Sequence, residues 1–217
     1  KARFLQLLGN DVSDLLNNNQ PVLVGETKFG QVGVEGAMLV DIDSPQTFYD
    51  LNKKAASCRT TTSTFKNDTS SRSHALTHIT IENTKFPSLE PGELFIIDLA
   101  GSESSADMQF HDKDLIKQTQ HINTSLMALK ECIRNRALAA INPDKIPHIP
   151  YRNSKLTLML KDSFELESTK RSKTLIIANV SSSIADLGMT KNTLRFIVPI
   201  KVGSTLKKSQ GHLEPNS

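Results

Sequence analysis

The chain has 217 residues, of which 37% are hydrophobic and 23% charged, a composition typical of a folded globular protein and not of a disordered one. No apolar run reaches the roughly 18 residues that a membrane-spanning helix needs, and no basic-then-apolar signal layout opens the chain. Two distant cysteines, Cys58 and Cys132, argue against a disulfide framework or zinc site and favour a reducing, cytoplasmic setting in which both are buried.

The first part of the chain reads as short strands followed by a helix. Ser44 and Pro45 have the character of an N-cap and a first helical residue, and the apolar spacing after them predicts an amphipathic helix. Further on, residues 75–82 alternate, which predicts a half-buried strand with Ala75 facing inward and His78 outward. Apolar runs punctuated by glycines predict earlier strands at residues 2–8, 22–24 and 32–34.

The remaining elements alternate between the two types. Residues 94–99 form a continuous apolar run broken by one acid, as in a strand covered on both faces. The later patterns predict a long helix through Ile122 and Ile133, a helix at 154–164, a strand at 175–180, and a helix at 191–197 that Pro199 stops. We therefore expect an α/β fold with a mixed sheet between helices, in one domain at residues 1–202 followed by a flexible C-terminal tail at 203–217.

The net charge of +3 hides an uneven distribution. Residues 11–50 contain seven acidic side chains and one basic, whereas residues 113–173 contain twelve basic and six acidic. The basic half is either a solvated helical surface or a face that meets an acidic partner. Nucleic acid is not expected as that partner, because aromatic residues make up only 5% of the chain and tryptophan is absent.

Asp98 is the first residue that points to chemistry. An acid at the end of a buried apolar strand is costly unless a cation neutralises it, and Gly101 follows in a turn where a backbone N–H can approach a ligand. In P-loop nucleotide hydrolases an aspartate at the end of a strand helps to hold Mg²⁺, so Asp98 is a candidate for that role.

A second polar segment, NDTSSRSH at residues 67–74, directly precedes the strand at 75–82. Hydroxyl groups suit Mg²⁺ coordination and the orientation of water, and an arginine can pair with a carboxylate on another loop. The same residues could instead form an ordinary polar turn. The segment NDTSSRSH lies upstream of DLAGSE at residues 98–103, and the two motifs together are a more specific signal than either one alone.

Taken together, these motifs resemble the kinesin motor domain. The segment at 67–74 has the form of kinesin switch I, and DLAGSE has the form of switch II. The match extends over nearly the whole chain, in the family's order, through INTSL at 122–126, PYRNSKLT at 150–157 and NTLRF at 192–196. Within the family, LKECIR at 129–134 looks most like the internal-motor, microtubule-depolymerising branch.

The resemblance implies a P-loop NTPase-like kinesin motor fold and a set of functional residues. Asn67 and Ser70 lie near the nucleotide, and Ser71 reaches Mg²⁺ and the γ-phosphate. Asp98 binds Mg²⁺ through water and Gly101 senses the γ-phosphate. Arg72 and Glu103 close the site with a salt bridge around the attacking water.

The resemblance also gives the basic half a partner, the acidic surface of the microtubule. Arg152 and Lys155 match positions that meet tubulin in kinesins. Lys130, Arg134 and Lys161 lie in neighbouring helices by pattern only, as tubulin contacts or as solvated charges. The resemblance also implies a cytoplasmic location, on microtubules or the spindle.

The sequence contains no Walker A motif, G-x-x-x-x-G-K-[ST]. A kinesin carries that loop upstream of the segment matched here, so we expect these residues to be part of a larger motor. In that motor Mg·ATP or ADP is bound, whereas these residues alone are expected to be inactive and to lack tight ATP binding. Two readings stay open: part of a microtubule-dependent ATPase, or a motor-like module that binds microtubules or a motor partner without turnover.

Overall fold

The computed structural model describes residues 1–61, 72–101, 113–141, 147–165 and 172–209. Contacts group the chain into two compact units. The first consists of Lys1–Gly101 with Met108–Ile122, and the second of Ser102–Asp107 with Asn123–Ser217. No described helix is long and apolar enough to cross a membrane.

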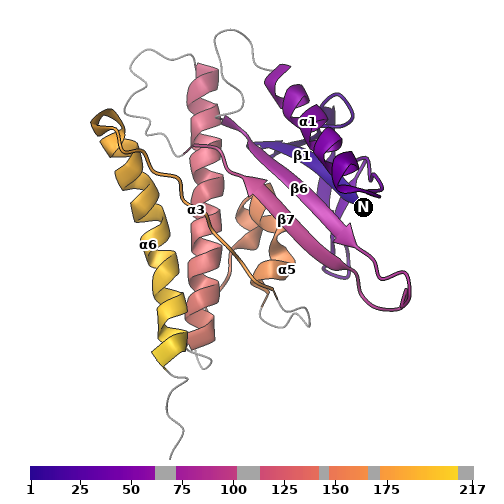
Figure 1. Ribbon diagram of the computed structural model, residues 1–217. Helices are drawn as coiled ribbons and strands as arrows, with labels where there is room; N and C mark the ends of the chain where they lie inside the picture. The colour runs from indigo at the N-terminus through magenta and orange to yellow at the C-terminus, as the bar shows by residue number, and fades with distance from the viewer. Residues whose placement is uncertain (62–71, 102–112, 142–146, 166–171, 210–217) are drawn as a thin grey trace, which may run out of the picture. The chain divides into compact units, whose positions relative to one another are not determined.

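The first unit is built on a five-stranded sheet with the order β3-β2-β1-β6-β7 (Figure 1). The central strand β1 pairs with β2 on one side and with β6 on the other, and every pair among the described strands of this sheet is antiparallel. The strands are β1 (Ala2–Leu8), β2 (Asp11–Asp14), β3 (Gln20–Pro21), β6 (His74–Ile81) and β7 (Gly92–Asp98).

A separate hairpin is formed by β4 (Leu23–Glu26) and β5 (Val32–Glu35). The predicted strands at 2–8, 22–24 and 32–34 are therefore confirmed to within about two residues. Strand β2 was not predicted, because this four-residue strand reads Asp-Val-Ser-Asp and has only one apolar side chain.

Helix α1 (Pro45–Thr61) lies across one face of this sheet (Figure 1). The predicted cap is confirmed, since the N–H of Thr47 donates to Ser44 Oγ at 3.0 Å. Ala55 of α1 packs with Phe4 of β1 in the core of the unit, and Cys58 is only partly buried. This packing sets the last turn of α1 beside the ends of β6 and β7.

Two sequence-based predictions for β6 and β7 are wrong. His78 of β6 is buried and does not face outward as predicted, and His74 is buried too. Ile79, on the predicted inward face, does pack against the core that contains Phe4, whereas Ile81 at the end of the strand is 62% exposed. Polarity was a poor guide there because a histidine can be buried once its ring has a partner. In β7, Leu94 and Ile96 are about half exposed, because β7 lies at the edge of the sheet among the described strands and is not covered on both faces.

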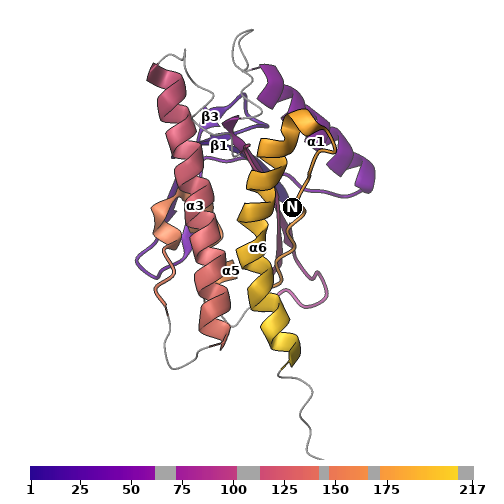
Figure 2. The same cartoon turned by 90° about the vertical axis from the view of Figure 1, so that its left-hand side faces the viewer.

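The regular secondary structure among the described residues of the second unit is all helical. Helix α3 (Lys113–Ile141) enters it at Asn123 and runs beside α6 (Leu187–Ser209) in both views (Figures 1 and 2). The predicted helix at 154–164 is present as two short helices that meet at Leu160. The shorter elements are η2 (Tyr151–Asn153), α4 (Lys155–Met159), α5 (Lys161–Phe164) and η3 (Ile184–Asp186).

The predicted strand at 175–180 is not present. Residues 172–183 have no regular secondary structure, and Leu175 and Ile177 are 84% and 76% exposed. A strand requires a neighbouring strand to satisfy its backbone groups, and no described strand pairs with this segment.

The predicted end of the last helix is also wrong. Helix α6 continues through Pro199 to Ser209, so residues 203–209, assigned from the sequence to a flexible tail, are helical. A proline inside a helix removes one backbone hydrogen bond and favours a kink, which the turns on either side can tolerate. The rest of the predicted tail lies outside the described residues.

Candidate functional site

The ladder between β6 and β7 brings the two sequence motifs together. Ala75 of β6 lies directly opposite Asp98 of β7. Ser73 and His74, which end the first motif, therefore lie beside the residues that begin the second. Antiparallel pairing places the entry to one strand next to the exit from the other.

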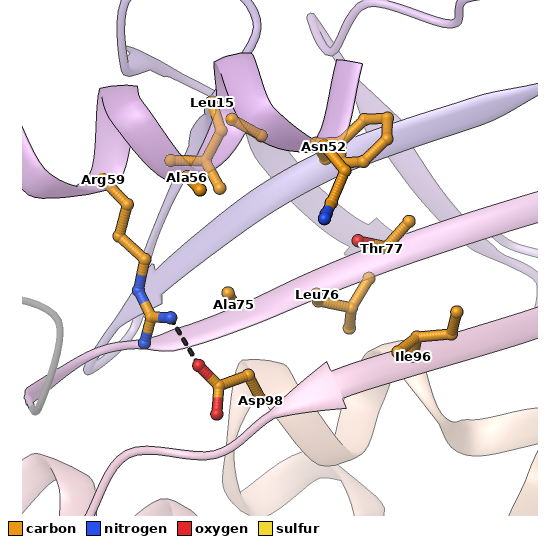
Figure 3. Close-up of a pocket in the computed structure, with 11 residues that line it drawn as sticks. Leu15, Asn52, Ala56, Arg59, Ala75, Leu76, Thr77, Ile96 and Asp98 are labelled. Carbon is orange, nitrogen blue, oxygen red and sulfur yellow. Dashed lines mark hydrogen bonds and ion pairs between the residues drawn. The ribbon is translucent and has the colours of Figure 1, made fainter. Parts of the chain in front are cut away.

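Arg59, in the last turn of α1, supplies the cation that Asp98 requires. Its Nη1 atom lies 2.6 Å from Asp98 Oδ2 (Figure 3). Its Nη2 atom donates to the carbonyl oxygen of Ser73 at 2.6 Å. The Arg59 side chain is 11% exposed and that of Asp98 is 73% exposed. A cation therefore does pair with Asp98, but the prediction that this carboxylate is buried is wrong.

Arg59 was not among the predicted site residues. A signal was available, because Arg59 is four residues after Ala55 and so continues the buried stripe of α1. A cation on a buried helical stripe needs an acidic partner. The sequence had already indicated that Asp98 is an acid in need of a cationic partner.

Ser73 joins three elements at this point. Its hydroxyl accepts a hydrogen bond from Gln6 Nε2 of β1 at 3.1 Å and a longer one from Arg59 Nε at 3.4 Å. Both Ser73 and Gln6 are buried. Buried polar groups that satisfy one another rigidify a site, so the start of β6 is fixed to both α1 and β1.

His74 holds the backbone that follows Asp98. The ring is 1% exposed, and its Nδ1 atom accepts the N–H of Ala100 at 3.0 Å. Burial, with a smaller contribution from the nearby Arg59 charge, lowers the pKa of His74 to about 4, while Asp98 acts in the opposite direction. The imidazole is therefore neutral at physiological pH and can accept the hydrogen bond from Ala100.

An apolar groove leads to the ion pair. It has a volume of about 290 Å³ and lies between α1 and the sheet, with Phe4 and Leu15 on its lining and the Arg59–Asp98 pair at one end (Figure 3). Thr77 and Ile96 line it from β6 and β7. The charged pair is thus accessible along the face of the sheet that carries α1.

The structure describes only some of the predicted site residues. Arg72 is half-buried and directly precedes Ser73, and Gly101 is the last described residue after β7. The others, which remain predictions, lie outside the described residues: Asn67, Ser70, Ser71 and Glu103.

In the second unit, the predicted partner-binding cations differ in their surroundings. Arg152 is exposed, with its guanidinium 4.8 Å from the centre of the Tyr151 ring, and Arg134 is exposed on α3. Lys155 is half-buried. The Lys130 ammonium lies 6.0 Å from the centre of the Phe196 ring, which joins α3 to α6.

The prediction of Lys161 as a surface cation is wrong. Lys161 is 5% exposed, and its ammonium pairs with Glu165 at 3.3 Å and lies 5.5 Å from the centre of the Tyr151 ring. A buried ammonium is stable only with such partners. Lys161 therefore organises the segment around Tyr151, and its charge is not presented at the surface.

Comparison with known proteins identifies the family. Residues 1–201 match the model of the kinesin motor domain. The chain belongs to the kinesin motor domain family. Similar proteins include diatom spindle kinesin-1 of Cylindrotheca fusiformis, 39% identical over 91% of this chain, and the kinesin-like protein KIN-13B of Arabidopsis thaliana, 36% identical over 91%. The KIN-13 relative is consistent with the predicted internal-motor branch.

Solved kinesin structures share the fold. The C-terminal motor and motor homology domain of Kar3Vik1 matches with a TM-score of 0.72 and 29% identity over 92% of this chain and 50% of its own. The Kar3 motor domain of Saccharomyces cerevisiae matches with a TM-score of 0.70 and 32% identity, over 92% of this chain and 59% of its own. The predicted α/β fold of the P-loop NTPase-like kinesin type is confirmed.

The kinesin chain described here spans only part of its relatives. It covers 30% of the length of the diatom protein and 28% of the Arabidopsis protein.

Proposed function

We propose that these residues form the switch and partner-binding part of a microtubule-dependent motor ATPase. The observation that carries the proposal is the convergence of Arg59, Ser73, His74 and Ala100 around Asp98, where the two motif-bearing loops leave neighbouring strands. Membership of the kinesin motor domain family supports the proposal, because the motif resemblance implies nucleotide hydrolysis that is coupled to microtubule binding.

In this proposal the substrate is Mg·ATP. Phosphoryl transfer depends on positioning and on neutralising charge, and it needs little covalent chemistry from the protein. When Mg·ATP is bound, Asp98 and Ser71 would hold the Mg²⁺ ion, Gly101 would donate its N–H to the γ-phosphate, and Asn67 and Ser70 would line the nucleotide. Arg72 and Glu103 pair to enclose the attacking water.

The Arg59–Asp98 pair adds a constraint to that assignment. Asp98 Oδ2 is engaged by a guanidinium at 2.6 Å, while the side chain as a whole is 73% exposed. The carboxylate is therefore held in place by Arg59 and still open on its other side. Such a fixed, partly solvated carboxylate suits contact with Mg²⁺ through water, which keeps most of its hydration shell.

The decisive experiment compares Glu103→Ala and Arg72→Ala in the natural protein that carries these residues. Loss of the enclosing pair should leave nucleotide affinity within about threefold and reduce microtubule-stimulated turnover by at least two orders of magnitude. Glu82→Ala serves as the control, because that carboxylate forms an exposed ion pair with Lys1. Normal turnover in either switch variant would contradict the assigned roles.

The alternative is a module that binds a filament or a motor partner without turnover. The feature that favours it is the absence of a Walker A motif from the sequence. Calorimetric titration of the 217-residue chain with Mg·ATP should show no saturable binding under either reading. Tight binding would contradict the expectation that the phosphates need a cradle beyond these residues. Turnover by the natural protein decides between the two readings.

The proposed partner is the microtubule, in the cytoplasm or on the spindle. The cations of the second unit are suited to bind it. Arg152 and Arg134 are exposed, and the acidic outer surface of tubulin would complement them. Lys155 and Lys130 are half-buried and contribute less to an encounter. No membrane or nucleic-acid partner is proposed.

A further inference from the structure

We propose that His74 is a positioning residue that sets the backbone of Ala100–Gly101 by accepting the Ala100 N–H. The inference rests on the proposed function, since it is the γ-phosphate contact of Gly101 that this hydrogen bond would hold ready. The resemblance to kinesin switch I implied no role for His74.

The buried N–H of Ala100 needs a hydrogen-bond acceptor outside the strand ladder. The β6–β7 ladder ends at the pair Ala75–Asp98, and no described strand pairs with the backbone after Asp98. Ala100 is nevertheless 5% exposed. A buried N–H without an acceptor costs on the order of 1 to 3 kcal/mol. The imidazole of His74, 3.0 Å away, provides the acceptor.

The position of His74 relative to Asp98 also supports this role. Side chains alternate along a strand, so His74 projects from the face opposite to that of Ala75, and Ala75 is the partner of Asp98. Arg59 binds the Asp98 carboxylate from the α1 face, while His74 binds the next turn from the other face. The end of β7 is therefore held on one face by Arg59 of α1 and on the other by His74 of β6.

The chemical state of the ring is a further condition for this role. To accept an N–H, Nδ1 must carry no proton, so the ring is neutral and its hydrogen is on Nε2. The buried position of His74 favours that neutral form. An asparagine side chain places an oxygen close to the position of Nδ1, whereas a leucine fills the volume without an acceptor. The two substitutions therefore separate hydrogen bonding from packing.

The experiment uses the natural protein with His74→Leu and His74→Asn, and with His78→Leu as the matched control. His78 lies on the same strand and face as His74, is also buried, and stacks on Phe95 at 4.3 Å between ring centres. Amide hydrogen exchange of Ala100 is measured without nucleotide, and kcat and KM for Mg·ATP are measured with microtubules. Thermal unfolding confirms that each variant is folded.

If His74 positions the turn, His74→Leu should lower Ala100 protection about tenfold and lower kcat about tenfold at a nearly unchanged KM. His74→Asn should restore both, and His78→Leu should alter neither beyond its effect on stability. Unchanged Ala100 protection in His74→Leu, or His74→Asn as impaired as His74→Leu, would overturn the proposal. Absence of turnover in the unsubstituted protein would instead refute the proposed function, and the exchange data would still report on the hydrogen bond.

Discussion

At the scale of single residues, His74 links protonation to stability. Its pKa is lowered from 6.5 to about 4 in the folded chain, mainly by burial. Between these two values the unfolded chain binds the proton and the folded chain does not, so stability falls as the pH falls. The contribution is fully present above pH 6.5 and is lost as the pH approaches 4.

We predict that the free energy of unfolding decreases by about 2 kcal/mol between about pH 7.5 and pH 5 because of His74. Urea denaturation across this range measures the decrease. His74→Asn, which cannot be protonated there, should flatten that part of the pH profile. A profile equally steep in the variant would assign the pH dependence to other groups.

Asp14 is a second residue whose burial makes a prediction possible. It is fully buried in β2, and its two oxygens accept the N–H groups of Leu16 at 2.8 Å and Met38 at 2.7 Å. Asp14→Ala would leave two donors unpaired, and we expect a loss of about 3 kcal/mol in the free energy of unfolding. Asp11→Ala, an exposed position on the same strand, should change it by less than about 0.5 kcal/mol.

At the scale of elements, local patterns predicted those that depend on local interactions. Helix α1 begins at Pro45 with the Ser44 cap, as expected, because cap and apolar stripe lie within one segment. Residues 175–180 have an equally clear strand pattern and form no strand among the described residues, because pairing depends on distant segments. An apolar pattern indicates that a segment can form a strand, but a strand forms only where another strand pairs with it.

The candidate site shows the same division. Asp98 and Gly101 could be identified from their motif, and the need for a cation near Asp98 followed from elementary electrostatics. Its identity, Arg59, is 39 residues away along the chain and depended on how α1 packs on the sheet. The acceptor role of His74 was unpredictable from the sequence, since it depends on where β7 ends relative to β6.

Considered as a whole molecule, the chain carries its positive charge in the part that we propose binds microtubules. Arg152→Ala should weaken co-sedimentation with microtubules roughly threefold to tenfold at low salt, and by less as the ionic strength rises. Lys53→Ala, an exposed charge on α1, provides the control. Equal effects of the two substitutions would place the contact elsewhere.

Lys161→Met tests whether the buried Lys161 stabilises the fold or binds the partner. Because the Lys161 ammonium contacts Glu165 and the Tyr151 ring and is barely exposed, its loss should change the folding stability more than the salt dependence of binding. Thermal unfolding and co-sedimentation over a salt series separate the two effects. A reduced salt slope with unchanged stability would restore Lys161 to the surface cations.

The edge position of β7 has a consequence for how the protein behaves in concentrated solution. An edge strand offers unpaired backbone groups, and the half-exposed Leu94 and Ile96 add apolar area beside them. The 217-residue chain should therefore self-associate as its concentration rises, by strand addition along β7. Ile96→Lys places a charge on that edge and should shift sedimentation toward the monomer, whereas Lys85→Ala in the β6–β7 connection should not.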